Sequence, residues 1–264
     1  NASMSDSLIH PTAVIDPSAV VADGVTVGPY SVVGANVNIG AGSVLKSHVV
    51  IEGYTTIGEN NTFFPFSAIG QITQDLKYVG EPTALIIGDH NTFRENTTIH
   101  RGTTEEVPTR IGDHNLFLSY SHVAHDCQVG SHCILSNNGT LGGHCEVGDH
   151  AIISGLSGAH QFCRIGEHSL VGGCTKIVQD VPPFTIVDGS PAAVRGLNLV
   201  GLQRRGFDET TRRALKRAYK KLFLSKKVNL AQLTEELAES ELTEDVNVAR
   251  LIEFIRTSER GVIR

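Results

Sequence analysis

The chain has 264 residues, a formal net charge of −6 at pH 7 and a pI near 6.0. Aromatic residues make up only 6% of it, and with this acidic balance a nucleic-acid partner is not expected. No apolar run approaches the roughly 20 residues of a membrane-spanning helix, and nothing after Met4 resembles a signal peptide, so we expect a cytoplasmic protein without an integral membrane segment.

A six-residue repeat dominates the first part of the chain. Residues 1–3 precede the only methionine, Met4, and are interpreted as an artificial extension. From Ile15 to Ile177 an apolar residue returns at every sixth position, and only Asp75, Glu81 and Glu105 interrupt this pattern. Neither an α-helix nor an ordinary sheet has a period of six, so the repeat predicts a solenoid over residues 4–191.

The other positions of the repeat indicate how each unit folds. The residue after the apolar position is often Gly, which suits a turn, and the fourth residue after it is usually small. One large and one small inward side chain per short strand describe a prism of three flat parallel sheets. Three repeats make one coil, and coils stack roughly 4.8 Å apart. The period alone leaves the hand of the coil open.

Two segments leave the repeat, at about residues 71–84 and 102–109. The first contains QDLKYVGEPT, with Asp75 and Lys77, and the second follows IHRG and carries Glu105 and Glu106. An insertion in a solenoid disturbs the stacking least when it lies on the outside. We therefore expect both segments to be loops that form the walls of a cleft.

The histidines fall into two groups. His114, His132, His150 and His168 recur three repeats apart in turns such as IGDH, and His90 shares the turn position. A turn that tolerates the left-handed conformation accounts for this column, and a metal-binding ladder is the alternative. A second group lies outside that column near one flank, and its members favour general acid–base chemistry: His122, His125, Asp126, His144 and His160.

Four cysteines occupy the small inward position, namely Cys127, Cys133, Cys145 and Cys163. Reduced cysteines acting as small core residues are the favoured interpretation. The spacing lacks CxxC pairs, so neither a metal site nor a cofactor is predicted.

Residues 192–264 are predicted to form an α-helical C-terminal domain, because composition changes near Pro191. The expected helices run from an N-cap at Asp208 to about Leu224, from an N-cap at Asn229 to about Ser240, and from Thr243 to about Arg256. The last of these is expected to bury Val246, Ala249, Ile252 and Ile255. Basic residues crowd Arg204 to Lys227, either as a solvated helix face or as a docking surface for an acidic protein or a phosphate group.

Several motifs together closely resemble the bacterial UDP-N-acetylglucosamine acyltransferase family over Leu8 to Arg264. They are IHPTAVIDPSA, QDLKYVGEPT, TIHRGT, HVAHDC, GAHQFC, VGGC, QDVPPF, NLVGLQRRGF and RGVIR. The resemblance implies a left-handed parallel β-helix and transfer of an (R)-3-hydroxyacyl group from acyl carrier protein to the glucosamine 3-hydroxyl of UDP-GlcNAc, the first step of lipid A synthesis. It also implies a homotrimer with active sites between subunits.

The resemblance further implies roles for individual residues. His125 would be the general base, Asp126 would orient a histidine, and the backbone N–H of Gly143 would stabilise the oxyanion. The residues implied to bind the sugar, the diphosphate and the nucleotide are Asp75, Lys77, His122, His144, His160, Gln161, Asn198, Arg204 and Arg205. The residues implied to dock acyl carrier protein are Arg212, Arg213, Lys216, Arg217, Lys220 and Lys221.

Gly173 occupies the position that the family uses as an acyl-chain ruler and leaves room for a longer chain. Two positions depart from the family: Val200 replaces a common acidic residue, and Pro191 stands where other members carry histidine. Acylation of a 3-amino UDP-sugar is an alternative reaction. The N-acyltransferase of the next acylation step is disfavoured because it carries an extra N-terminal domain. Two hypotheses from different classes remain, a γ-carbonic-anhydrase-like zinc enzyme and a purely structural solenoid.

Overall fold

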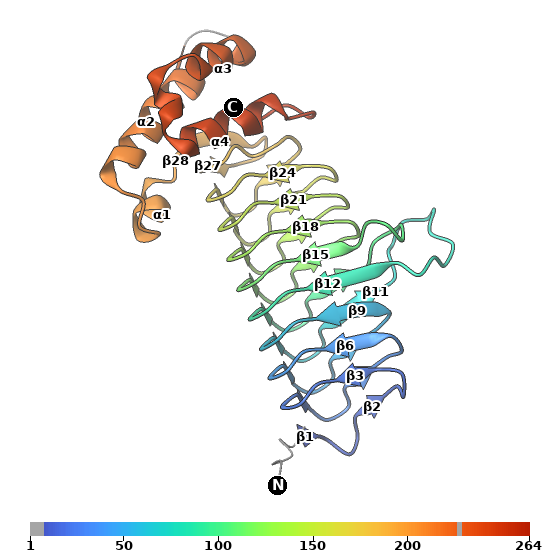
Figure 1. The fold of residues 1–264 in the computed structure, drawn as a ribbon. Helices are drawn as coiled ribbons and strands as arrows, with labels where there is room; N and C mark the ends of the chain where they lie inside the picture. Colours follow the sequence, from blue (N-terminus) through green and yellow to red (C-terminus); the bar gives the residue numbers. More distant parts are fainter. Residues whose placement is uncertain (1–7, 226–228) are drawn as a thin grey trace.

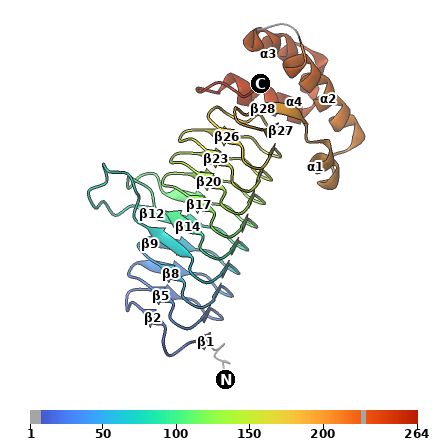
Figure 2. The ribbon, with the colours of Figure 1, turned by 180° about the vertical axis from the view of Figure 1, so that it is seen from behind.

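The computed structural model describes residues 8–225 and 229–264. A tall β-helix ends in a group of helices that covers the C-terminal end of the stack (Figure 1). Seen from behind, the coils follow one another without interruption from β2 to β26 (Figure 2). The chain forms a left-handed parallel β-helix with a small helical C-terminal part, as the sequence predicts.

Each coil contributes one short strand to each of three sheets. The first sheet contains β1 (Leu8–Ile9), β4 (Thr26–Val27), β7 (Val44–Leu45), β10 (Thr62–Phe63), β13 (Thr92–Phe93), β16 (Leu116–Phe117), β19 (Ile134–Leu135), β22 (Ile152–Ile153), β25 (Leu170–Val171), β27 (Thr185–Asp188) and β28 (Ala193–Leu197). The second contains β2 (Val14–Ile15), β5 (Val32–Val33), β8 (Val50–Ile51), β11 (Ala68–Gln71), β14 (Thr98–His100), β17 (His122–Val123), β20 (Thr140–Leu141), β23 (Gly158–Ala159) and β26 (Lys176–Ile177). The third contains β3 (Val20–Val21), β6 (Val37–Ile39), β9 (Tyr54–Ile57), β12 (Ala84–Ile87), β15 (Thr109–Ile111), β18 (Gln128–Val129), β21 (Glu146–Val147) and β24 (Arg164–Ile165).

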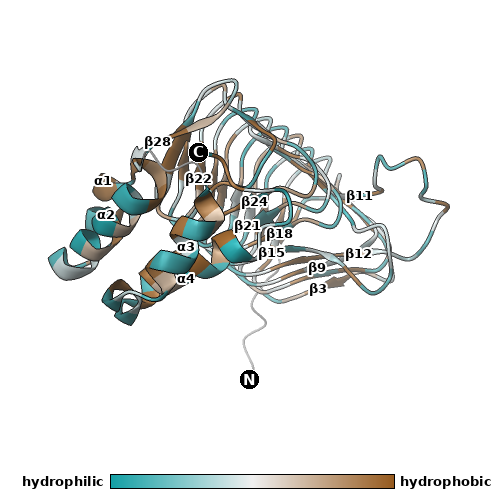
Figure 3. Ribbon diagram, turned by 90° about the horizontal axis from the view of Figure 1, so that it is seen from above, coloured by the Kyte–Doolittle hydropathy of each residue, from teal (hydrophilic) through white to brown (hydrophobic). Residues whose placement is uncertain are grey.

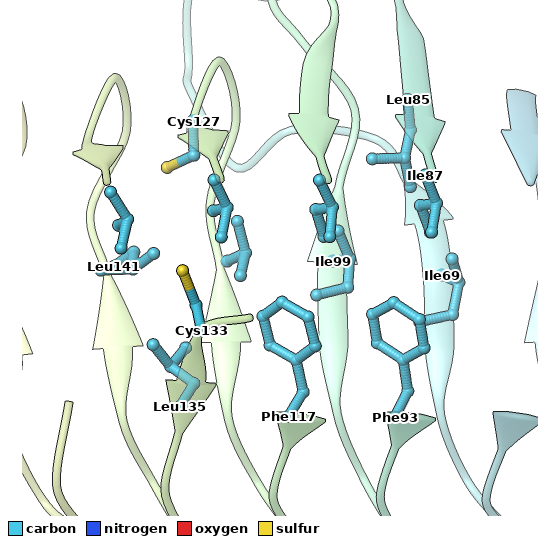
Figure 4. Packing of buried hydrophobic residues seen from close by; sticks show 14 of the residues in the cluster. Ile69, Leu85, Ile87, Phe93, Ile99, Phe117, Cys127, Cys133, Leu135 and Leu141 are labelled. Carbon is cyan, nitrogen blue, oxygen red and sulfur yellow. The ribbon is translucent and has the colours of Figure 1, made fainter. Parts of the chain in front are cut away.

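The apolar position of each repeat points into the prism and stacks on its equivalent in the next coil. Phe63, Phe93 and Phe117 are buried with parallel rings whose centroids lie 4.8 and 4.9 Å apart. Figure 4 shows Phe93 and Phe117 beside the aliphatic side chains and cysteines of neighbouring coils. This ladder of side chains buries a continuous apolar core along the axis, which single coils could not do.

The predicted core cysteines lie in this interior. Cys127, Cys133, Cys145 and Cys163 are buried free thiols. Burial raises the pKa of Cys133 to about 12 and that of Cys163 to about 11. The Cys133 and Cys163 thiols are therefore protonated, and a protonated thiol is a poor metal ligand.

Both excursions leave the β-helix and return in register. Residues 72–83 connect β11 to β12, and residues 101–108 connect β14 to β15. Ile87 still pairs with Ile57 on one side and Ile111 on the other. Figure 3, seen from the helical end, shows the first excursion projecting sideways from the prism. The stacking is thus kept, apart from a bulge between Ile69 and Gln71, where β11 pairs with β14, and the additional residues lie outside it.

The corner between the third and first sheets carries the predicted histidine column. Its five histidines all have positive φ, between 55° and 60°, as a left-handed turn requires, and they are His90, His114, His132, His150 and His168. Their rings stack in sequence with centroids 4.6 to 4.9 Å apart. The column is a stacked turn ladder that continues into the helical part through Phe184.

The C-terminal part contains α1 (Leu199–Arg204), α2 (Glu209–Phe223), α3 (Leu230–Ala238), a 3-10 turn (Glu241–Glu244) and α4 (Val246–Arg256). Asp208 and Asn229 cap α2 and α3 through hydrogen bonds to backbone N–H groups, as predicted. Among the described residues, no helix is both long and apolar enough to cross a membrane. The helical core packs on the β-helix through Phe184 and Leu197.

Three details differ from the sequence prediction. The segment after Pro191 is not helical, because β28 pairs antiparallel with β27 and extends the first sheet. Helix α4 does not begin at Thr243, which lies in the 3-10 turn, because the side chain of Asp245 caps the helix. The buried face of α4 consists of Val248, Leu251 and Ile252, so Ile252 is buried as predicted, whereas the predicted core residue Val246 is 61% exposed.

Acid should destabilise the fold through His168. This ring is only 8% exposed, its Nδ1 has no hydrogen-bond partner among the described residues, and burial lowers its pKa from 6.5 to about 4. Between these pH values the unfolded chain binds a proton that the folded chain excludes, so the free energy of unfolding falls as the pH drops below about 6.5. His168→Phe should reduce the loss between pH 7.5 and pH 5 by about 2 kcal/mol.

Urea unfolding at the two pH values measures this difference. His114→Phe is the matched control, because His114 stands in the same column but is exposed. Equal acid sensitivity of His168→Phe and the unmodified chain would exclude His168 as the cause.

Candidate active site

A cleft of about 530 Å³ lies on the flank of the β-helix where the first excursion meets the second sheet. Its lining residues come from three parts of the chain: Gln74, Asp75, Leu76 and Lys77 from the excursion, His100, Ala124 and His125 from neighbouring coils, and Gln161 from two coils further on. The cleft therefore joins the predicted loop with the predicted general base.

His125 and Asp126 form a hydrogen-bonded pair at the floor of this cleft. The Nδ1 atom of His125 lies 2.7 Å from Oδ2 of Asp126, and their side chains are 13% and 2% exposed. Thr103 donates to both carboxylate oxygens, from its backbone N–H at 2.8 Å and its hydroxyl at 2.7 Å. Burial raises the pKa of Asp126, but the hydrogen bonds from His125 and Thr103 outweigh it and lower the pKa overall.

This pairing determines which nitrogen of His125 is available for chemistry. An ionised carboxylate only accepts hydrogen bonds, so Nδ1 carries the proton and donates it to Asp126. Nε2 is then left as a base. The arrangement is that of an imidazole oriented by a buried carboxylate, which fits proton abstraction.

Three further rings surround the pair. His144 crosses His125 edge-on, with centroids 5.2 Å apart, and its Nε2 lies 3.4 Å from Asp126 Oδ2. His144 also stacks on Phe162 at 4.5 Å. His122 bonds to the hydroxyl of Thr98 at 2.7 Å, and burial lowers its pKa.

His100 stands edge-on to His122 at 4.7 Å. Burial, and then the neighbouring His122 and His125, lower the pKa of His100 to about 4. Both His100 and His122 are consequently neutral near pH 7.

Gly143 lies directly against the His125 ring. A Cβ built on Gly143 would fall 2.3 Å from Cε1 and 2.6 Å from Nε2 of His125. Only glycine brings the main chain this close to the basic nitrogen. A backbone group thus borders the position where a reacting atom would approach Nε2.

His125, Asp126 and His144 are also the only group among the described residues with the geometry of a possible metal site. Ligand atoms of His125, Asp126 and His144 all lie within 4.8 Å of one another. The carboxylate, however, already accepts hydrogen bonds from His125 and Thr103. The hydrogen-bonded pair therefore accounts for these side chains without an ion.

One chain does not bring all the predicted site residues together. His160 is exposed one coil beyond His144, with Nδ1 3.5 Å from an Nη2 of Arg260. The nucleotide-binding candidates stand at a different corner, beside the histidine column: Asn198 Nδ2 donates to the carbonyl of His168, and Arg205 lies near His150. Arg204 is exposed on α1.

Gly173 is exposed at the corner between the first and second sheets, one residue before Cys174 in the turn. The predicted ruler and the predicted nucleotide residues thus occupy two corners of the prism, and His125 occupies the third.

Several residues of the site were not predicted from the sequence. Thr103, which holds Asp126, lies in the second excursion, where the predicted features were Glu105 and Glu106, and both of these are exposed. His100 and Phe162 were not predicted either, because each occupies an ordinary position of the repeat. The motif IHRGT, which contains His100 and Thr103, was the available signal.

Two family models match three stretches of the chain. The second domain of UDP-N-acetylglucosamine O-acyltransferase matches residues 180–263, and the bacterial transferase hexapeptide repeat matches residues 6–41 and 108–143. The acyl-(acyl-carrier-protein)–UDP-N-acetylglucosamine O-acyltransferase of Akkermansia muciniphila is 59% identical over 253 residues, which are 96% of this chain and 98% of that protein. The chain belongs to the UDP-N-acetylglucosamine O-acyltransferase family.

Other family members agree over the whole length. The enzyme of the same name from Saccharophagus degradans is 47% identical over 98% of this chain and all of that protein. Among solved structures, LpxA from Acinetobacter baumannii superposes with a TM-score of 0.94 at 45% identity, covering 98% of this chain and 100% of that one. The family member from Bacteroides fragilis also has a TM-score of 0.94, at 37% identity over 97% of this chain and 100% of that one.

Proposed function

We propose that this chain transfers a 3-hydroxyacyl group from acyl carrier protein to the glucosamine 3-hydroxyl of UDP-GlcNAc, the first step of lipid A synthesis. The observation that carries the proposal is the His125–Asp126 pair at the floor of the cleft, in a member of this family. The products are the 3-O-acylated sugar nucleotide and the free thiol of the carrier.

His125 acts as the general base. Asp126 holds its Nδ1–H, so Nε2 accepts the proton of the sugar hydroxyl while the hydroxyl oxygen attacks the thioester carbonyl. The imidazolium then returns the proton to the departing thiolate. Asp126 stabilises the transient imidazolium, because the carboxylate is ionised and nearly inaccessible to solvent.

The backbone N–H of Gly143 stabilises the oxyanion of the tetrahedral intermediate. Support comes from the position of the Gly143 main chain directly against the His125 ring, beside the place where the thioester carbonyl is attacked. The excursion residues Asp75 and Lys77 bind the sugar and its diphosphate with His122, His144, His160 and Gln161. Lys77 is exposed at the cleft mouth, where an ammonium group can meet phosphate oxygens.

The active enzyme is a homotrimer in which a neighbouring subunit completes each cleft. In a single chain the nucleotide candidates Asn198, Arg204 and Arg205 lie at another corner of the prism from His125. Apolar side chains are also left exposed on both sides of the second sheet: Leu76 is 100% exposed on the excursion, and Tyr120 and Leu156 are 60% and 65% exposed at the corner that carries Gly173. Exposed apolar groups of this size indicate a surface that another subunit covers.

The acyl chain follows the corner that carries Gly173. A Cβ on Gly173 would meet nothing nearer than the carbonyl of Gly155 at 3.5 Å, so the surface there is open. A bulky side chain at this position would shorten the groove, and glycine therefore suits a longer acyl chain.

Helix α2 docks the acidic carrier protein. Its basic residues are not equivalent, because Arg213 pairs with Glu209, Arg217 approaches Glu241 at 3.5 Å, and Arg212 donates to the carbonyl of Phe207. Lys216 and Lys220 are exposed, and neither forms an ion pair with another described residue. Lys221 stands next to them, half-buried. These lysines are the cations available to a partner.

Replacing the base should abolish transfer without unfolding the protein. His125→Ala should lower kcat by at least a hundredfold, with an unchanged melting temperature, in an assay of acyl-carrier thioesters of several lengths with UDP-GlcNAc and its 3-amino analogue. Asp126→Asn should retain more activity, because the imidazole remains but its orientation is lost. His132→Ala, in the exposed turn column, is the control.

Near-normal turnover by His125→Ala would refute its assignment as the base. Transfer to the 3-amino sugar alone would favour the sister reaction, which the same base can catalyse.

Mixing two inactive variants tests whether subunits share a site. His125→Ala and Arg205→Ala, unfolded and refolded together, should regain activity, because about a quarter of clefts in randomly mixed trimers combine two unmodified sides. His125→Ala mixed with Asp126→Asn should show only the residual activity of Asp126→Asn, because both changes lie on the same side. No recovery in the first mixture would contradict a shared cleft.

Charge reversal on α2 should weaken docking of the carrier only. Lys216→Glu with Lys220→Glu should raise the KM for the acyl carrier protein about tenfold, more at low salt than at high salt, and leave the KM for UDP-GlcNAc unchanged. Lys46→Glu, on the β-helix, controls for net charge. An equal rise in both KM values would locate the effect elsewhere.

A further inference from the structure

The excursion 72–83, which carries Asp75 and Lys77, forms no strand of its own and depends on a few anchors. Both of its ends are fastened by consecutive backbone groups of the next coil. The N–H of Arg101 donates to the carbonyl of Gln71 at 3.0 Å, and that of Gly102 donates to the carbonyl of Ala84 at 3.1 Å. One dipeptide therefore closes the base of the loop.

The side chain of Arg101 continues this attachment into the loop. It is only 8% exposed, and its two terminal nitrogens donate to the Gly70 carbonyl and to the Tyr78 hydroxyl, each at 3.2 Å. The Tyr78 hydroxyl in turn donates to the Glu81 carbonyl at 2.7 Å. Arg101 thus reaches the middle of the loop through a single tyrosine.

The surrounding backbone makes room for this guanidinium. A Cβ on Gly53 would fall 1.7 Å from Nη1 of Arg101, and Gly53 has a φ of +68°. The Nε–H of Arg101 is buried with no partner among the described residues, and no described carboxylate pairs with the side chain. Burying a cation without a counter-ion lowers the free energy of unfolding. The burial of Arg101 is therefore better explained by a role in positioning the excursion than by a contribution to stability.

The same short segment also holds the catalytic pair. Two residues after Arg101, Thr103 donates twice to the carboxylate of Asp126. Gly102 lies between these two residues in a tightly packed position. A Cβ there would lie 2.5 Å from the Val107 carbonyl oxygen and 3.0 Å from Asp126 Oδ1. Residues 101–103 therefore connect the loop on one side with the His125–Asp126 pair on the other.

We propose that Arg101 and Tyr78 are positioning residues that hold the excursion 72–83 at a fixed height above His125, so that Asp75 and Lys77 meet the sugar nucleotide at the distance that the base requires. Neither residue lines the cleft. This inference rests on the proposed function, because the loop matters here only as a substrate-binding element.

The test measures loop motion and substrate binding separately. In Tyr78→Phe, which removes one oxygen, and in Arg101→Lys, which keeps the charge but loses the fork of donors, hydrogen exchange of amides 72–83 should speed up. The KM for UDP-GlcNAc should rise about tenfold in each, with kcat within about twofold of the unmodified enzyme. The two effects should not add in the double variant, because both changes break the same link.

Tyr54→Phe and Arg110→Lys are matched controls, because both residues are exposed on strands of the third sheet next to the excursions. Tyr78→Phe remains informative if Arg101→Lys does not fold. Unchanged exchange of the loop, or faster exchange with an unchanged KM, would overturn the proposal.

If the unmodified chain transfers no acyl group, the proposed function fails. The exchange data and the dissociation constant for UDP-GlcNAc, measured by calorimetry, then decide the role of Arg101 and Tyr78 by themselves. A larger dissociation constant in both variants supports that role, and an unchanged dissociation constant refutes it.

Discussion

The structure of this protein depends on the stacking of equivalent side chains in adjacent coils, at the spacing between parallel strands. Parallel strands in adjacent coils lie roughly 4.8 Å apart, and the rings of Phe63, Phe93 and Phe117 repeat at 4.8 and 4.9 Å. The stack tolerates an insertion only where the chain returns in register, as it does when Ile87 pairs with Ile57 after the first excursion. The residues of the catalytic site therefore lie mainly at one corner of the prism and in the two excursions.

The catalytic pair depends on that spacing. Asp126 and His144 occupy the same left-handed turn position, each with φ of 60°, on successive coils of one corner. Stacking brings His144 to the Asp126 carboxylate, and His125, one residue earlier in the coil, bonds to it directly. A structural ladder of turns at another corner, from His90 to His168, uses the same geometry without a carboxylate at its centre. The histidine column and the catalytic corner therefore share one backbone geometry and differ in the side chains that pack against them.

The excursions supply those neighbours. Thr103 reaches Asp126 from the second excursion, and Arg101 ties the first excursion to the same coil. Burying the Arg101 guanidinium without a counter-ion costs stability, which fits a residue that holds the geometry of the loop. The cleft is therefore rigid on the β-helix side and depends on a few polar contacts on the loop side.

The repeat, the three sheets, the buried cysteines, the histidine column and two of the helix caps could all be predicted from the sequence, because each depends on local spacing or on a local hydrogen bond. It also indicated His125, Asp126 and the loop at Asp75. The roles of Thr103 and Arg101 became evident only in the tertiary structure, because the Thr103–Asp126 and Arg101–Tyr78 contacts join residues 23 positions apart, which no local period encodes. The β27–β28 pairing and the Asp245 cap are local features, but neither alters the spacing of apolar residues on which the predicted helices rested.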